Sequence, residues 1–162
     1  MKHTLVDTLK YVFIIYCIIM LGLLFNRTPA TMGYSYAEVL ELNLNLVPFK
    51  TIMLYINILL NPANLYLLEV AIVNLVGNLV VFIPLGLFLP LFWRKFYSYF
   101  YTILYSAIII IVVELLQLFT LRGSCDIDDL ILNIVGVSIG YGCYHLGRFI
   151  YRKHQLKLIQ NK

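Results

Sequence analysis

Charged side chains are scarce in this chain. Asp, Glu, Lys and Arg make up only 12% of its 162 residues, whereas 62% are hydrophobic. A soluble domain carries about 25% charged residues. The shortage therefore excludes an ordinary soluble fold and is typical of helical membrane proteins, and the length suits a single domain over residues 1–162.

Several chemical signatures are also missing. The three cysteines have neither the spacing of a metal site nor that of a disulfide framework. The chain contains no HExxH motif, no nucleophile elbow and no phosphate-binding loop. It has no basic run interleaved with aromatics, so we expect no nucleic-acid partner. The sequence thus identifies no cofactor and no metal site.

Long apolar runs, by contrast, occur four times. About 20 apolar residues are needed to cross the hydrocarbon core of a bilayer as a helix. No small-x-small cleavage site follows the first run, so we interpret it as an uncleaved transmembrane helix rather than a signal peptide. The predicted spans are about Tyr11 to Phe25, Leu67 to Phe92, Tyr99 to Leu121 and Leu130 to Ile150.

The segment between the first two spans is different. Residues 26–46 are the least apolar part of the chain and predict a loop with one short helix. Pro48 then turns the chain back towards the membrane, and Thr51 to Leu60 is apolar but too short to span. The expected fold class is an all-α integral membrane protein. It is a bundle of four transmembrane helices with a short interfacial or re-entrant segment after the first.

The distribution of cations predicts the topology. With a cytoplasmic N-terminus, nine Lys and Arg residues fall on the inside and three on the outside, which obeys the positive-inside rule. Both termini are then cytoplasmic, with a basic tail over about residues 151–162. The three outside cations are Arg27, Lys50 and Arg122.

This topology collects polar residues at the outer side. The stretch from Glu114 to Gly140 is the most polar part of the apolar region. On a helix, Asp126, Asp129 and Asn133 share one face while Asp128 points away. Carboxylates within a membrane helix are costly and therefore suggest a site. The candidate set is Glu69, Asn74, Asn78, Glu114, Gln117, Arg122, Asp126, Asp129 and Asn133.

A purely structural interpretation competes with a site. Asp126 could cap the fourth helix, Asp129 could complement its dipole, and Arg122 could pair with either. The amides could be hydrogen-bond links between helices. Glu114 is harder to explain in this way, because it lies within an apolar run and has no helix dipole to complement.

Three chemistries remain open for the set. Glu114 and Asp129 could act as an acid/base pair, with one proton retained by mutual repulsion. Alternatively, carboxylates and amides could hold a hard divalent cation, or could bind the cationic part of a ligand without reaction. The three histidines fall on the cytoplasmic side, which argues against a histidine-dependent mechanism at the outer face.

The order of these motifs resembles the VanZ-like family. The resemblance covers about residues 40–142, and no signature position departs from the pattern. The residues that carry it are Asn45-Leu-Val-Pro48-Phe49, Asn78-x3-Phe82-x-Pro84-x-Gly86, Glu114-x2-Gln117, and Arg122-x3-Asp126-x2-Asp129-x3-Asn133-x2-Gly136-x3-Gly140.

The resemblance implies a small bacterial membrane protein. The founding member of the family is linked to low-level resistance to the lipid-tailed glycopeptide teicoplanin. On this basis we expect a polar pocket in the outer leaflet that binds or modifies an amphiphilic or lipid-linked envelope molecule. Glu114 and Asp129 would be the acid/base candidates, and Asn78, Gln117, Arg122, Asp126 and Asn133 would contact or position the ligand. Gly136 and Gly140 would let helices approach closely.

Two other classes remain open. The protein could be a non-enzymatic scaffold or partner of envelope machinery, with the polar set holding the bundle together. A transporter is the weakest interpretation, because four helices would need to dimerise and the chain shows no internal repeat. The sequence defines neither the ligand nor the oligomeric state.

Overall fold

The computed structural model describes residues 2–26 and 33–160. Within them, four helical segments are long and apolar enough to cross a membrane: Asp7–Phe25, Leu65–Phe92, Tyr99–Phe119 and Ile127–Leu158. The predicted four-helix, all-α membrane architecture is confirmed. Arg27 and Lys162, two of the cations used for the topology, lie outside the described residues.

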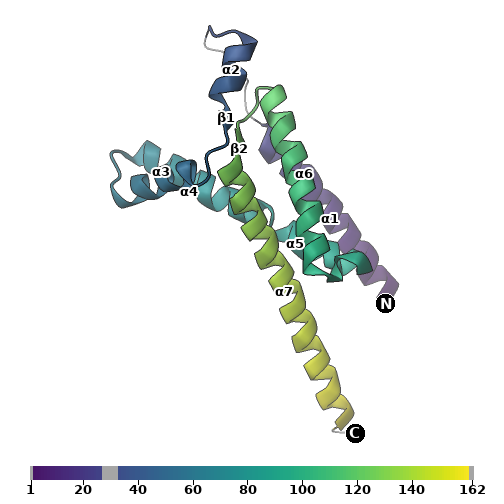
Figure 1. The fold of residues 1–162 in the computed structure, drawn as a ribbon. Helices are drawn as coiled ribbons and strands as arrows, with labels where there is room; N and C mark the ends of the chain where they lie inside the picture. Colours follow the sequence, from purple (N-terminus) through teal and green to yellow (C-terminus); the bar gives the residue numbers. More distant parts are fainter. Residues whose placement is uncertain (1, 27–32, 161–162) are drawn as a thin grey trace.

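The first and last spans place both ends of the chain at one end of the molecule. Helix α1 (Lys2–Phe25) begins there and α7 (Ile127–Gln160) finishes there, opposite the short strands (Figure 1). Residues 151–160, expected as a polar tail, continue α7 as regular helix. Neither Gly nor Pro occurs after Gly147, so nothing in this segment ends the helix.

The second span consists of two helices. Helices α4 (Leu65–Val81) and α5 (Ile83–Phe92) meet at Phe82, and Pro84 lies in the first turn of α5. Proline lacks the N–H that would continue the hydrogen-bond ladder of α4, so the break falls just before it. A 3₁₀ turn, η1 (Arg94–Tyr97), then leads into α6 (Tyr99–Phe119).

The α4–α5 span crosses α7 at very short range. A Cβ atom on Gly136 would lie 2.1 Å from the Leu79 carbonyl oxygen, and one on Gly140 would lie 1.9 Å from that of Ile83. From the other side, a Cβ on Gly86 would meet the Val137 carbonyl oxygen at 2.0 Å. Only glycine permits this approach, which confirms the close-contact role predicted for Gly136 and Gly140.

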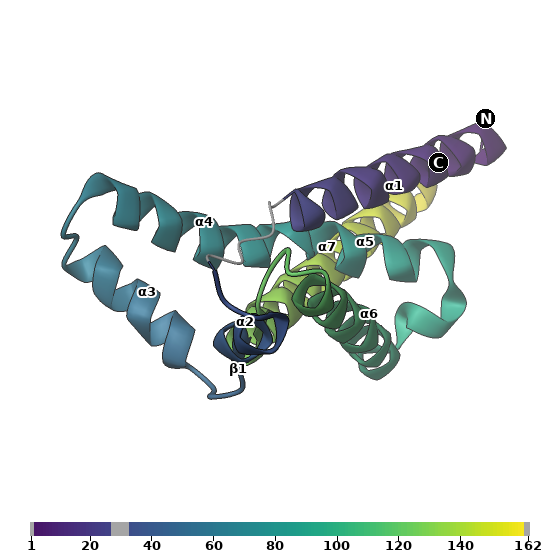
Figure 2. The same ribbon diagram turned by 90° about the horizontal axis from the view of Figure 1, so that it is seen from above.

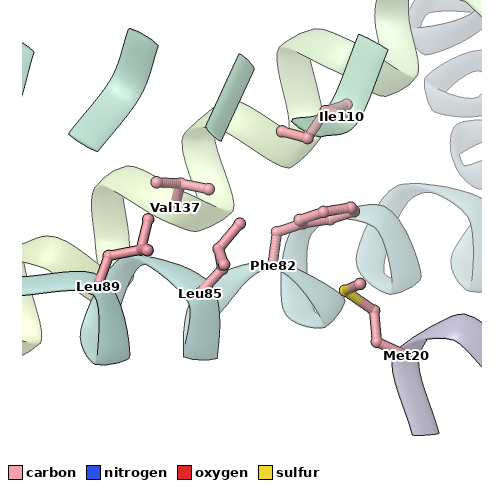
Figure 3. Close-up of a cluster of buried hydrophobic side chains, with 6 residues drawn as sticks. All are labelled: Met20, Phe82, Leu85, Leu89, Ile110 and Val137. Atoms are coloured by element: carbon pink, nitrogen blue, oxygen red, sulfur yellow. The ribbon is translucent and has the colours of Figure 1, made fainter. Parts of the chain in front are cut away.

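The core lies beside this crossing and takes side chains from all four spans. Met20 comes from α1, Ile110 from α6 and Val137 from α7, and they pack around residues of the second span (Figure 3). Those residues are Phe82, Leu85 and Leu89. The cluster therefore fixes the four helices relative to one another.

The segment between α1 and α4 builds the opposite end of the molecule. Helix α2 (Tyr36–Leu42) begins with a capping box made by Ser35 and Glu38. Strand β1 (Leu44–Asn45) follows, and then α3 (Lys50–Leu60), the short apolar helix that was predicted. Helices α3 and α4 form an antiparallel hairpin that extends away from α6 (Figures 1 and 2).

Candidate functional site

A two-residue parallel pairing joins distant parts of the chain. Leu44 of β1 pairs with Cys125 of β2 (Cys125–Asp126), and Asn45 pairs with Asp126. The Cys125 N–H also donates to the Asn43 carbonyl at 2.9 Å. The pairing brings the Asn45-to-Phe49 motif against the aspartates that begin α7.

Asp128 holds the N-terminus of α3. Its carboxylate accepts the backbone N–H groups of Phe49, Thr51 and Ile52 at 2.5, 2.7 and 3.0 Å. The first N–H groups of a helix lack partners within the helix and carry its positive partial charge, so a carboxylate suits them. Asp128 is 0% exposed. Asp128 was not among the predicted site residues because it points away from the Asp129 face, and its partners lie instead at the start of α3.

Asp126 has its own set of partners. Oδ2 accepts from the Thr51 hydroxyl at 2.6 Å, and Oδ1 accepts from the Asn45 amide at 3.1 Å. Oδ1 also accepts the Asp128 N–H at 2.9 Å, which is the predicted capping of α7. Asp126 thus precedes α7 rather than sharing its face with Asp129, because the chain is still extended in β2.

Two further polar residues donate hydrogen bonds to backbone carbonyls in the last turn of α1. The Gln117 amide donates to the Leu24 carbonyl at 2.7 Å, and the Arg122 guanidinium donates to the Phe25 carbonyl at 2.8 Å. The last carbonyls of a helix lack internal partners and carry its negative partial charge, which favours a cation there. Arg122 thus serves the end of α1.

A small polar cavity lies between the end of α1 and the start of α7. It is lined by carboxylates from two helices, Glu114 of α6 and Asp129 of α7, together with the Asn78 and Gln117 side chains. The Asn78 amide donates to Asp129 Oδ1, and Glu114 Oε2 accepts the Asp126 N–H at 3.3 Å. Glu114 is 6% exposed. The remaining lining residues are Leu23, Leu24, Gly123 and Ser124.

The size of the cavity limits what can enter. Its volume is about 40 Å³. A single water needs about 10–15 Å³ of such space, so the cavity admits a few waters or one small polar group. A whole lipid head group does not fit.

Besides Arg122 and Asp126, three further members of the predicted set do not line the cavity. Glu69 is exposed on α4, and the Asn74 amide donates to the Val70 carbonyl of its own helix at 2.7 Å. Both fall away from the cavity because this part of α4 runs out beside α3 (Figure 2). Asn133 is 2% exposed on α7, and its Oδ1 has no hydrogen-bond partner among the described residues.

The acidic residues also act on Cys125. The pKa of the Cys125 thiol is raised, mainly by partial burial and to a smaller extent by the negative charges of Glu114, Asp126 and Asp129. The thiol thus reports on the charge of the site. Within the described residues, no group of three or more His, Cys, Asp or Glu side chains is arranged to hold a metal ion. The divalent-cation hypothesis therefore gains no support.

Comparison with known proteins agrees with the motif pattern. A family model described as VanZ/LLP1 matches residues 13–149, a range that includes all the residues that line the cavity as well as Asp128 and its partners at the start of α3. A search of curated proteins finds no significant match, and neither does a search of solved structures.

Proposed function

The chain belongs to the VanZ/LLP1 family, whose model covers residues 13–149, and we propose that its cavity receives a small polar group of an amphiphilic or lipid-linked envelope molecule. The ligand's apolar part stays in the surrounding bilayer. The protein is a multi-pass membrane protein. The proposal places it in a bacterial cell membrane with both termini in the cytoplasm and the cavity at the outer leaflet.

One observation carries the proposal: two carboxylates from different helices, Glu114 and Asp129, line the same cavity. Ionisable groups within a membrane-spanning bundle are costly and mark ligand, ion or proton pathways. Such a pair can bind a cationic group, or it can move a proton to or from a bound hydroxyl or water. In the enzymatic version, Glu114 or Asp129 is the acid/base. Asn78 positions Asp129.

The proposed consequence is a lower sensitivity to lipoglycopeptides such as teicoplanin. These molecules carry a lipid tail and polar groups, so they enter the outer leaflet at the level of the cavity. Vancomycin has no lipid tail and is expected to respond little.

The test compares teicoplanin and vancomycin susceptibility of cells that express the wild type, Asp129→Asn, Glu69→Gln or no protein. Membrane abundance is measured in each case. Asn nearly preserves the shape of Asp129, whereas Glu69 is an exposed carboxylate away from the cavity and serves as the matched control. We expect protection to be lost in Asp129→Asn at unchanged abundance and retained in Glu69→Gln. Equal protection by both variants would remove Asp129 from the mechanism.

A second candidate is a membrane scaffold or partner of envelope machinery. It is favoured by the capping bonds, because Gln117, Arg122 and Asp126 each satisfy a helix end, as does Asp128. Under this alternative, Asp129→Asn lowers abundance and protection together.

A further inference from the structure

The charges of the molecule are separated between its two ends. Seven of the eight acidic residues, all of which the structure describes, lie on the side of α2, α3 and the cavity. We call this side the acidic end. Asp7 lies at the opposite end, where it pairs with Lys10 at 3.0 Å. We call that side the basic end; among the residues whose side chains are described, it carries Lys10, Arg94, Lys95, Arg148, Arg152, Lys153 and Lys157.

The length of α7 places part of the basic end at a definite depth. Arg148 follows the first residue of α7, Ile127, by 21 positions. At 1.5 Å per residue this is about 31 Å along the helix, close to the roughly 30 Å thickness of the hydrocarbon core. A helix that crosses the bilayer from its first turn therefore carries Arg148 and Arg152 at the level of the lipid phosphates.

A hollow of about 340 Å³ lies at this level. It is lined by His145, Arg148, Phe149 and Arg152, which share one face of α7. The Arg148 guanidinium lies over the Tyr97 ring of η1, 4.6 Å from its centroid. Arg148 also hydrogen-bonds the Tyr144 side chain, so two tyrosines hold the guanidinium in place beside the hollow.

His145 adds an independent observation. Its Nε2 atom is buried and has no hydrogen-bond partner among the described residues. The ring is held by Tyr141, whose centroid lies 4.4 Å away. A buried polar atom without a partner costs free energy, and His145 is one of the residues that line the hollow.

We propose that this hollow binds the phosphate of an anionic phospholipid in the leaflet at the basic end. Arg148 and Arg152 pair with the phosphate oxygens, and His145 Nε2–H donates to one of them. Phe149 is a largely exposed apolar residue, and it contacts the lipid above the phosphate. This apolar contact and the depth favour a phospholipid over inorganic phosphate, which shares the anionic chemistry.

The test counts lipids retained by the purified full chain in neutral detergent, by native mass spectrometry. The protein is titrated with phosphatidylglycerol, with phosphatidylcholine of the same chains, or with inorganic phosphate as competitor. The variants are Arg148→Gln/Arg152→Gln and a control of equal charge on the same helix, Lys153→Gln/Lys157→Gln. Arg148→Lys and His145→Gln are milder substitutions, which still test the site if the double arginine variant does not fold.

We expect the wild type to retain phosphatidylglycerol in preference to phosphatidylcholine. The double arginine variant should weaken this binding about 30-fold, since each cation near a lipid phosphate contributes about a factor of five. The double lysine variant should weaken it by less than about threefold. Arg148→Lys should retain the charge and still bind less, because the stacked planar group is lost.

Three outcomes would overturn the proposal. Equal losses in the two double variants would show diffuse attraction without a site. Equal retention of the two lipids would remove the anionic specificity. Displacement of phosphatidylglycerol by millimolar inorganic phosphate would assign the hollow to the free anion. None of these results bears on Asp129 or on teicoplanin, so the test is independent of the proposed function.

Discussion

The two ends of the molecule use charge in opposite ways. At the acidic end, Asp126 and Asp128 are buried and bind backbone N–H groups of α3 and α7. At the basic end, most of the cations are exposed, and two of them lie over aromatic rings: Lys95 over Tyr105 at 4.2 Å and Arg148 over Tyr97 at 4.6 Å. Charge therefore fixes internal geometry at the acidic end and faces the surroundings at the basic end. Substitutions should separate the two roles.

The largest effect is expected for Asp128→Ala. It leaves three backbone N–H groups at the start of α3 without their acceptor, which should lower the free energy of unfolding by about 4 kcal/mol. Thermal unfolding of the purified protein in detergent measures the loss. The control is Glu41→Ala, which removes an exposed carboxylate of α2. Equal stability of the two variants would contradict the role assigned to Asp128.

A smaller effect is expected at the helix crossing between the two ends. Gly140→Ala should destabilise the protein by about 2–3 kcal/mol, because its Cβ would overlap the Ile83 carbonyl. Gly142→Ala on the same helix meets nothing within 4 Å and should be neutral or slightly stabilising. The same unfolding assay compares them. If both variants behave alike, the close approach of the helices is not what holds the crossing.

The charge of the acidic end can be read through Cys125. Glu114→Gln removes one of the carboxylates that raise the thiol pKa, so more thiolate forms at a given pH. The alkylation rate at pH 7.5 should therefore rise severalfold. Glu69→Gln should leave the rate unchanged. A slower reaction in Glu114→Gln would mean that the variant changes access rather than charge.

The smallest effect is expected at the basic end. Arg152→Gln removes an exposed cation and should change the free energy of unfolding by less than about 0.5 kcal/mol. Its unfolding curve should therefore overlay that of the wild type. A large loss would show that the basic end also stabilises the fold, and the contrast between the ends would fail.

The helices could be predicted from the sequence because the residues that determine each helix lie within that helix. Long apolar runs define the spans, and proline's missing N–H explains the break just before Pro84. Gly136 and Gly140 indicated a close contact by their spacing alone. Their partner, which includes Gly86 of α5, came only from the structure.

The site was predicted less completely because its bonds join distant segments. Asp128 was missed because a helical wheel compares residues of one helix, and its partners lie 76 to 79 positions earlier. Glu69 was included because counting along a span assumes an upright helix, whereas this part of α4 leans out beside α3. Arg122 suggested an ion pair, yet it donates to the Phe25 carbonyl at the end of α1. Glu114, Asp129, Asn78 and Gln117 do line one cavity.

The long separation in sequence between Asp128 and its partners has a consequence for protein synthesis. Phe49 has a left-handed backbone with φ of 65°, and its N–H reaches Asp128, 79 positions later. At a translation rate of about 5–20 residues per second, the start of α3 waits about 4–16 s before that carboxylate has been made. During this interval α3 exists without its cap. Helix α3 is therefore capped only when the final helix begins to be made, and the arrival of that helix completes the acidic end.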